Sequence, residues 1–83
     1  MQYFCDTMRH LVCVPYTVEN LHRMAEDLGI KPCWFHGNAS YPHYDIPKRR
    51  ISEIMAKCNV VPSRQILAIV KGEYDGNHDQ GSF

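Results

Sequence analysis

The chain has 83 residues, enough for one domain, because single hydrophobic cores usually occur in chains of about 50–200 residues. Apolar residues make up 45% of the sequence and charged residues 22%, a balance that excludes a disordered chain. Nine Lys and Arg balance nine Asp and Glu, so no net charge attracts a nucleic-acid backbone and nucleic acid is disfavoured as a partner. So short a chain buries only about 60% of its unfolded surface, which keeps stabilisation as a homo-oligomer open.

Neither the apolar runs nor the cysteines suggest export. No run approaches the roughly 20 apolar residues that cross a bilayer, and no charged segment followed by an apolar run marks the chain for secretion. The cysteines form no C-x-x-C pair and no metal-finger spacing, and each lies in or beside an apolar stretch: Cys5, Cys13, Cys33 and Cys58. We therefore expect reduced structural thiols, a cytoplasmic location and no membrane partner.

Short β-prone apolar runs predict three strands in the first half of the chain, at residues 2–5, 11–14 and 33–36. Pro15 ends the second run, because a proline cannot continue the hydrogen bonds of a sheet. Residues 37–46 contain Gly, Asn, Ser and Pro without a helical period, which predicts a loop. Val60 and Val61 give a further short strand or a turn.

Apolar residues at helical spacing predict three helices, at residues 18–28, 48–58 and 64–71. We place Thr17 as the N-cap of the first helix and Gly29 as its stop. Asp45 and Ser63 are placed in the same way as the N-caps of the second and third helices.

The alternation of these elements predicts the α/β class, with a small sheet of three to four short strands covered by three helices. We expect one domain over residues 1–72. The polar, Gly-containing segment 73–83 predicts a flexible C-terminal tail.

Residues able to carry chemistry concentrate in the segment 36–50. It contains two imidazoles, a carboxylate and two phenols, followed by three consecutive cations at the predicted start of the second helix. Backbone N–H groups at a helix start, joined to guanidinium groups, form an anion site, and nearby aromatic rings can stack on a nucleotide base. We expect the ligand-binding residues to be His36, His43, Tyr44, Asp45, Lys48, Arg49 and Arg50.

The prolines in this segment favour an extended conformation around the sequence His43-Tyr44-Asp45. Pro42 and Pro47 each bias the preceding residue toward extended backbone. Because alternate side chains of an extended segment share a face, we expect His43 and Asp45 to face a common pocket and Tyr44 to face the core.

A second polar cluster follows the first predicted strand. Asp6 and His10 lie there, and ligands in open α/β sheets gather at the carboxyl ends of strands. Together with His43 and Asp45 they are the candidate catalytic residues for acid–base chemistry. No H-x-H or H-x-x-x-H spacing supports a metal site, so we expect none, and the pattern identifies no cofactor. A bond between Asp6 and His10 across a turn, with no ligand, stays open as the simpler alternative.

Several segments resemble one known family when they are taken together. They are Asp6 with Met8, Arg9 and His10, the helix between Thr17 and Gly29, Trp34-Phe35, and Pro42-His43-Tyr44-Asp45. Over residues 2–67 the chain resembles an uncharacterised family of bacterial and phage domains of unknown function (number 4031), which has a His-Tyr-Asp signature. It departs at Asn59-Val60, where the family has Gly-Ala, and at His36, where the family has Gln. The resemblance implies an intracellular phage or bacterial protein, and it supports the location of the site rather than its chemistry.

The leading hypothesis is a small intracellular binding module. It would hold a phosphate-bearing, nucleotide-like small molecule or a host protein surface through residues 36–50. The alternative is a hydrolase or nuclease that uses His43 and Asp45 with Asp6 and His10, with metal dependence left open. A third hypothesis is a pure interaction protein that dimerises or blocks a host partner through Trp34, Tyr41 and Tyr44. An enzyme needs its acidic and imidazole groups within about 3 Å of one another, whereas a binder needs only convergent donors.

Overall fold

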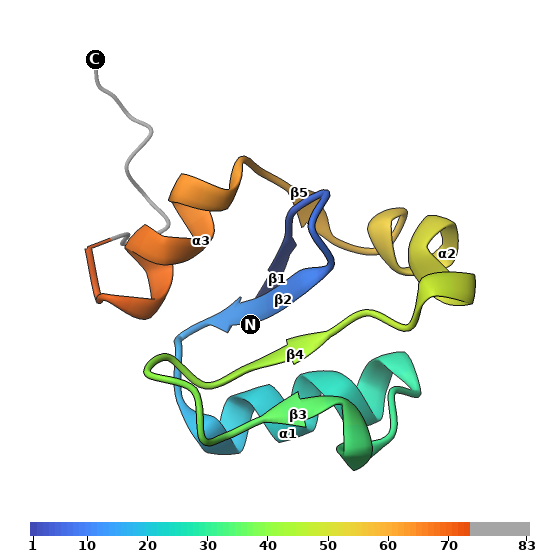
Figure 1. The fold of residues 1–83 in the computed structure, drawn as a ribbon, viewed down its shortest axis with the longest axis horizontal. Helices are drawn as coiled ribbons and strands as arrows, with labels where there is room; N and C mark the ends of the chain where they lie inside the picture. The colour runs from blue at the N-terminus through green and yellow to red at the C-terminus, as the bar shows by residue number, and fades with distance from the viewer. Residues whose placement is uncertain (74–83) are drawn as a thin grey trace.

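The computed structural model describes residues 1–73 and contains a mixed five-stranded sheet between helices (Figure 1). The strands lie in the order β3-β4-β2-β1-β5. Their bounds are β1 Gln2–Cys5, β2 His10–Val14, β3 Phe35–His36, β4 His43–Asp45 and β5 Asn59–Val60. All neighbouring pairs are antiparallel except β1 with β5, which is parallel. The α/β class is therefore confirmed, with five strands rather than three to four.

The additional strand, β4, lies within the segment that the sequence predicts as a loop. It pairs with β2 on one side and with β3 on the other. The prediction was wrong here because three residues show too little alternation to be recognised beside Gly, Ser and Pro. The strand predicted over 33–36 is also shorter, since Pro32–Trp34 form a 3-10 turn, η1, and the strand begins at Phe35.

The first helix, α1, covers Val18–Leu28 as predicted. The Thr17 side chain accepts a hydrogen bond from the backbone N–H of Asn20 at 3.0 Å. Gly29 ends the helix in the left-handed conformation with φ 71°, which glycine adopts without the steric cost that a Cβ brings. Local signals fix both ends of this helix.

The other two helices differ from the prediction at their starts. Residues 48–58 divide into a 3-10 turn, η2 (Lys48–Arg50), and a short helix, α2 (Ile51–Met55). Asp45 lies in β4, and Pro47 occupies the N-cap position of η2 without a side-chain cap, so Asp45 as N-cap was wrong. The third helix, α3, covers Ser63–Val70 with Pro62 at its N-cap position. Ser63 is thus the first helical residue rather than the cap, and its hydroxyl is used elsewhere.

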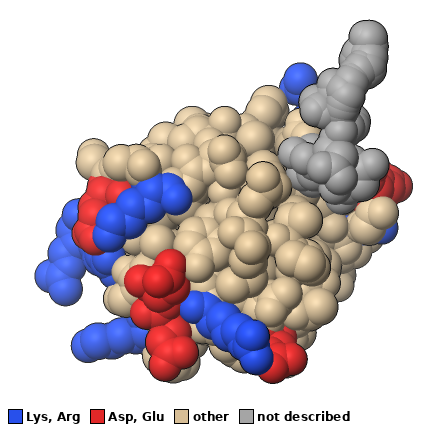
Figure 2. Space-filling model, turned by 180° about the vertical axis from the view of Figure 1, so that it is seen from behind, with Lys and Arg blue, Asp and Glu red and all other residues tan. Residues whose placement is uncertain are grey.

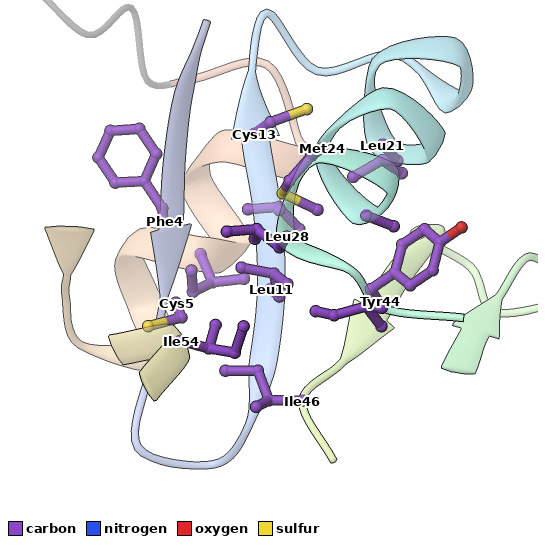
Figure 3. Packing of buried hydrophobic residues seen from close by; sticks show 14 of the residues in the cluster. Phe4, Cys5, Leu11, Cys13, Leu21, Met24, Leu28, Tyr44, Ile46 and Ile54 are labelled. Atoms are coloured by element: carbon purple, nitrogen blue, oxygen red, sulfur yellow. The ribbon is translucent and has the colours of Figure 1, made fainter. Parts of the chain in front are cut away.

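The sheet separates two apolar layers, as the alternation along each strand requires. Leu11 and Cys13 of β2 face α1, and Figure 3 shows them beside Leu21, Met24 and Leu28 of that helix. The intervening residue, Val12, is also fully buried and faces the opposite layer, where α3 contacts β2 and β1. Residues of β2 therefore hold a helix on each face of the sheet.

Tyr44 belongs to the layer beneath α1, on the face predicted for it. Its side chain is 1% exposed. Its hydroxyl lies 2.8 Å from Nδ1 of His22 in α1, and its ring lies 5.2 Å from that of Phe35. Because Tyr44 points this way, its neighbours His43 and Asp45 point to the opposite face, toward the layer that contains α3.

The four cysteines are free thiols that differ in exposure. Cys5 and Cys13 are buried, Cys58 is half-buried and Cys33 is exposed. Burial raises the pKa of Cys13 to about 11. A hydrogen bond between the Cys5 and Cys58 thiols, together with burial, raises the pKa of Cys58.

These differences predict selective alkylation of the native protein. Iodoacetamide reacts with exposed thiolates, so we expect Cys33 to be modified first and Cys13 to react only after unfolding. Peptide mass spectrometry after a short native exposure measures this order. Equal modification of Cys13 and Cys33 in the folded protein would contradict the packing described here.

In the part of the chain that the structure describes, no helix is both long and apolar enough to cross a membrane. The tail predicted at 73–83 lies outside the described residues from position 74 onward.

Candidate functional site

Three histidines lie side by side across neighbouring strands on the face opposite Tyr44. His10 of β2 is paired with Asp45 of β4, and His36 of β3 is paired with His43 of β4. The rings of His10 and His43 are 5.3 Å apart and nearly perpendicular, at 79°. The rings of His43 and His36 are 5.2 Å apart and stacked, at 15°. We call His10, His43 and His36 the histidine row.

One buried carboxylate anchors the His10 end of the row. Asp6 is 1% exposed and follows β1 directly. Its Oδ1 accepts hydrogen bonds from the backbone N–H groups of Met8 at 3.0 Å and His10 at 2.9 Å. Its Oδ2 accepts from the hydroxyl of Ser63 at 2.6 Å and lies 2.9 Å from Nδ1 of His10. Asp6 therefore fixes the turn between β1 and β2, the His10 ring and the start of α3 together.

The contacts of Asp6 also define its protonation state. Burial alone would raise its pKa, but hydrogen bonds from Ser63 and His10 outweigh burial and leave the pKa below its usual value. A carboxylate can only accept hydrogen bonds, so Nδ1 of His10 carries the hydrogen of this contact. Within residues 1–73, Nε2 of His10 has no protein hydrogen-bond partner, and the side chain is 42% exposed. Nε2 is the atom that can exchange a proton with a ligand.

The depressed pKa of Asp6 predicts an acid-dependent loss of stability. Its contribution is fully present above the unfolded-state pKa of about 3.9 and is lost as the pH falls through the lower folded-state pKa. We expect the free energy of unfolding of the wild type to fall more steeply below about pH 4 than that of Asp6→Asn. Urea unfolding from about pH 6 to about pH 3 measures the difference. Identical acid dependence of the two proteins would show that Asp6 is not stabilised as an anion.

The second carboxylate, Asp45, joins the other two histidines. Its Oδ2 lies 3.0 Å from Nε2 of His36, and its Oδ1 lies 3.5 Å from Nε2 of His43. Nδ1 of His43 is 2.9 Å from the carbonyl oxygen of Tyr41, which can only accept, so this nitrogen carries a hydrogen. Side-chain exposure is 21% for His43 and 25% for Asp45. Both groups are therefore partly shielded from water.

A cavity of about 380 Å³ opens beside this cluster. Its lining combines the imidazoles of His10 and His43 with Ser63 and apolar side chains of α3. The complete lining is His10, Ala39, Ser40, Tyr41, His43, Ser63, Ile66, Leu67 and Val70. We call this space the histidine cavity. Imidazoles and an apolar wall in one cavity are typical of small-molecule sites, which combine apolar surface with a few placed polar groups.

The structure divides the residues that the sequence placed in one site. It gathers Asp6, His10, His36, His43 and Asp45 in one cluster, whereas Tyr44 points to the opposite face. The predicted ligands Lys48, Arg49 and Arg50 line a separate hollow beyond the end of β4. The Arg50 guanidinium is already engaged, since it donates to the carbonyl oxygens of Leu28 and Gly29 at 2.7 Å each and to Glu53.

Sequence reasoning missed the contribution of α3 to the cavity. Ser63 was interpreted as a helix cap, although its hydroxyl bonds to Asp6 from the first turn. Leu67 is 42% exposed and lines the cavity, and the apolar run Ile66-Leu67-Ala68-Ile69-Val70, too wide for one buried face of a helix, is the local signal that could have indicated it. Among the described residues, no group of three or more His, Cys, Asp or Glu is arranged to hold a metal ion.

The family comparison agrees with the resemblance seen in the sequence. A family described as "Protein of unknown function (DUF4031)" matches residues 1–73, so the chain belongs to this family. Neither a search of curated proteins nor a search of solved structures gave a significant match. The family description states no activity, and the site geometry carries the functional argument.

Proposed function

We propose that the protein is a small hydrolase in which His10 acts as general base, with Asp6 as its orienting carboxylate. The observation that carries this proposal is the 2.9 Å contact between buried Asp6 and Nδ1 of His10 at the edge of the histidine cavity. Carboxylate and imidazole converge within the reach that acid–base catalysis needs, which favours an enzyme over a simple binder. Asp6 holds one tautomer of the ring, as the carboxylate of a Ser-His-Asp triad does.

The proposed reaction is hydrolysis of a small ester that is bound against α3. Nε2 of His10 removes a proton from a water molecule while the water oxygen bonds to the electrophilic carbon or phosphorus of the ester. The bond to the leaving oxygen breaks, and that oxygen receives a proton from the imidazolium form of His43. The ring centres of His10 and His43 are 5.3 Å apart, so both rings can reach one substrate. The proton on His10 then passes to His43, directly or through solvent, which restores both rings, so one water is consumed for each ester cleaved.

The remaining groups hold these two imidazoles in place. Asp6 stabilises the imidazolium that forms on His10, since its Oδ2 accepts from Nδ1. The Tyr41 carbonyl and Asp45 fix the ring of His43 from either side. Ser63 ties the apolar wall of α3 to Asp6, so the substrate-facing helix and the base share one anchor.

A binding module remains the second candidate, because the same cavity offers two imidazoles and an apolar wall. In that case it holds a phosphate-bearing small molecule or a host protein surface without turnover. In both versions we also propose that the protein is a cytoplasmic bacterial or phage protein and that it assembles as a homo-oligomer.

Release of p-nitrophenolate tests the proposal. The substrates are p-nitrophenyl acetate, p-nitrophenyl phosphate and bis(p-nitrophenyl) phosphate, each assayed with and without EDTA. We expect wild-type protein to hydrolyse at least one of them, His10→Ala to lose that activity, and His22→Ala to keep it, because His22 lies on α1 beneath the opposite face. Activity that EDTA abolishes would indicate the metal-dependent version. NMR shifts of the backbone amides around the cavity when a substrate is added, without release of p-nitrophenolate, would favour the binding module. Equal rates of hydrolysis for wild type and His10→Ala would overturn the hydrolase.

A further inference from the structure

A second hollow, of about 610 Å³, lies at the opposite end of β4 from the histidine cavity. Its lining comes from the end of α1, from η1 and from η2. The lining residues are Gly29, Ile30, Lys31, Cys33, Trp34, Pro47, Lys48, Arg49 and Arg50. We call this space the basic hollow. It shares no lining residue with the histidine cavity.

Three of the four cations that line the basic hollow have no ion-pair partner among the described residues. In residues 1–73, no acidic side chain pairs with Lys31, Lys48 or Arg49. The nearby carboxylate of Glu53 is already held by Arg50 at 2.8 Å and Lys57 at 3.3 Å. Figure 2 shows Lys and Arg side chains projecting at the end of the molecule that contains α2, at the left of that view, with some Asp and Glu side chains among them. Three unpaired cations around one concave surface favour an anionic ligand.

The hollow also has an aromatic wall. Trp34 is half-buried in η1, packs against the core and lines the hollow. Ile30 and Pro47, both buried, add apolar surface around it. A partly fixed indole beside cations matches a ligand that joins a flat aromatic ring to a phosphate, since nucleotide bases stack on aromatic side chains.

Arg50 supports this arrangement without being available to the ligand itself. Its guanidinium donates to two carbonyl oxygens at the end of α1 and to Glu53. It therefore joins the end of α1 to the start of α2, on either side of the hollow, and positions the segment that carries Lys48 and Arg49.

We propose that the basic hollow binds a nucleoside monophosphate, with its base stacked on Trp34 and its phosphate between Lys31, Lys48 and Arg49. This places a nucleotide ligand away from the histidines, at a site that functions whether or not the histidine cavity is catalytic. A negative result for nucleotide binding at the basic hollow therefore leaves the hydrolase proposal intact, and a negative result for hydrolysis leaves the nucleotide site intact.

Fluorescence of the single tryptophan of the chain reports this site directly. We expect AMP to quench Trp34 emission saturably, and adenosine or inorganic phosphate alone to bind at least tenfold more weakly. The double variant Lys48→Ala/Arg49→Ala should lose about tenfold or more in affinity for AMP, because charge-assisted hydrogen bonds to phosphate are removed. The charge-matched control Arg64→Ala/Lys71→Ala changes two exposed cations of α3 and its C-cap, outside the hollow, and should retain wild-type affinity.

Protection of Cys33 gives a second measurement that does not depend on fluorescence. Cys33 is exposed and lines the hollow, so bound AMP should slow its alkylation in wild-type protein and not in the Lys48→Ala/Arg49→Ala variant. Absence of saturable quenching and of protection at millimolar AMP would overturn the site. Equal affinity of the two double variants would show that the hollow does not hold the phosphate, and phosphate binding as tightly as AMP would show that Trp34 does not hold a base.

Discussion

Replacement of His10 by alanine is expected to lower the hydrolytic rate by about 10²–10⁴-fold, the usual contribution of a positioned general base. Nε2 of His10 is the imidazole atom left free by the Asp6 contact, and of the two described imidazoles that line the cavity His10 alone contacts a buried carboxylate. The fold should be retained, because the His10 side chain is 42% exposed and Asp6 keeps its bonds to Ser63 and two backbone N–H groups. Steady-state kinetics on the best p-nitrophenyl substrate measure the effect.

Two further variants separate catalysis from structure. His36→Ala removes the outer ring of the histidine row, which contacts Asp45 and not Asp6, and should reduce the rate much less than His10→Ala. His43→Ala removes the proposed acid and should reduce kcat most for substrates whose leaving group needs a proton. If His10→Ala and His36→Ala lower the rate equally, with unchanged circular dichroism, the assignment of His10 as the base is wrong.

Replacement of Tyr44 by alanine is expected to lower the free energy of unfolding by about 3–5 kcal/mol, the range for removing a large buried aromatic side chain. Tyr44 is 1% exposed, contacts Phe35 and bonds to His22 of α1, so the variant leaves a cavity between β4 and that helix. Against a typical total stability of about 5–15 kcal/mol, this is a large fraction. Urea unfolding at constant pH measures it.

Tyr44→Phe is the matched control, because it keeps the ring and removes only the hydroxyl bond to His22. It should cost about 0.5–1.5 kcal/mol. Equal destabilisation by the two substitutions would mean that the hydrogen bond, not ring burial, holds β4 against α1. A negligible effect of Tyr44→Ala would contradict the assignment of Tyr44 to the core.

The elements that the sequence predicted well are those with signals at both ends. The helix α1 has an apolar period, a side-chain cap at Thr17 and a left-handed glycine at Gly29, all within a few residues of one another. Strand β4 has none of these, because its strand character comes from pairing with β2 and β3 on either side. Pairing between distant segments leaves little trace in three residues of sequence.

The candidate site shows the same division. The prolines and the alternation of an extended segment correctly predicted that His43 and Asp45 share a face and that Tyr44 opposes them, but only His43 lines the histidine cavity. Nothing local indicated that Ser63 would reach Asp6 or that His36 would stack on His43, because these contacts depend on where α3 and β3 pack. Lys48 and Arg49 adjoin this segment in sequence, yet they line the basic hollow instead.

The proposed chemistry depends on which ring nitrogen of His10 carries the hydrogen. Long-range ¹H–¹⁵N correlation spectra of selectively labelled histidine measure this for the neutral ring, with His10→Gln used to assign the signals. We predict a protonated Nδ1, bonded to Asp6, and an unprotonated Nε2 that shifts when p-nitrophenyl phosphate is added. A neutral His10 with the hydrogen on Nε2, or an Nε2 signal that no substrate analogue perturbs, would contradict a base held by Asp6 at the histidine cavity.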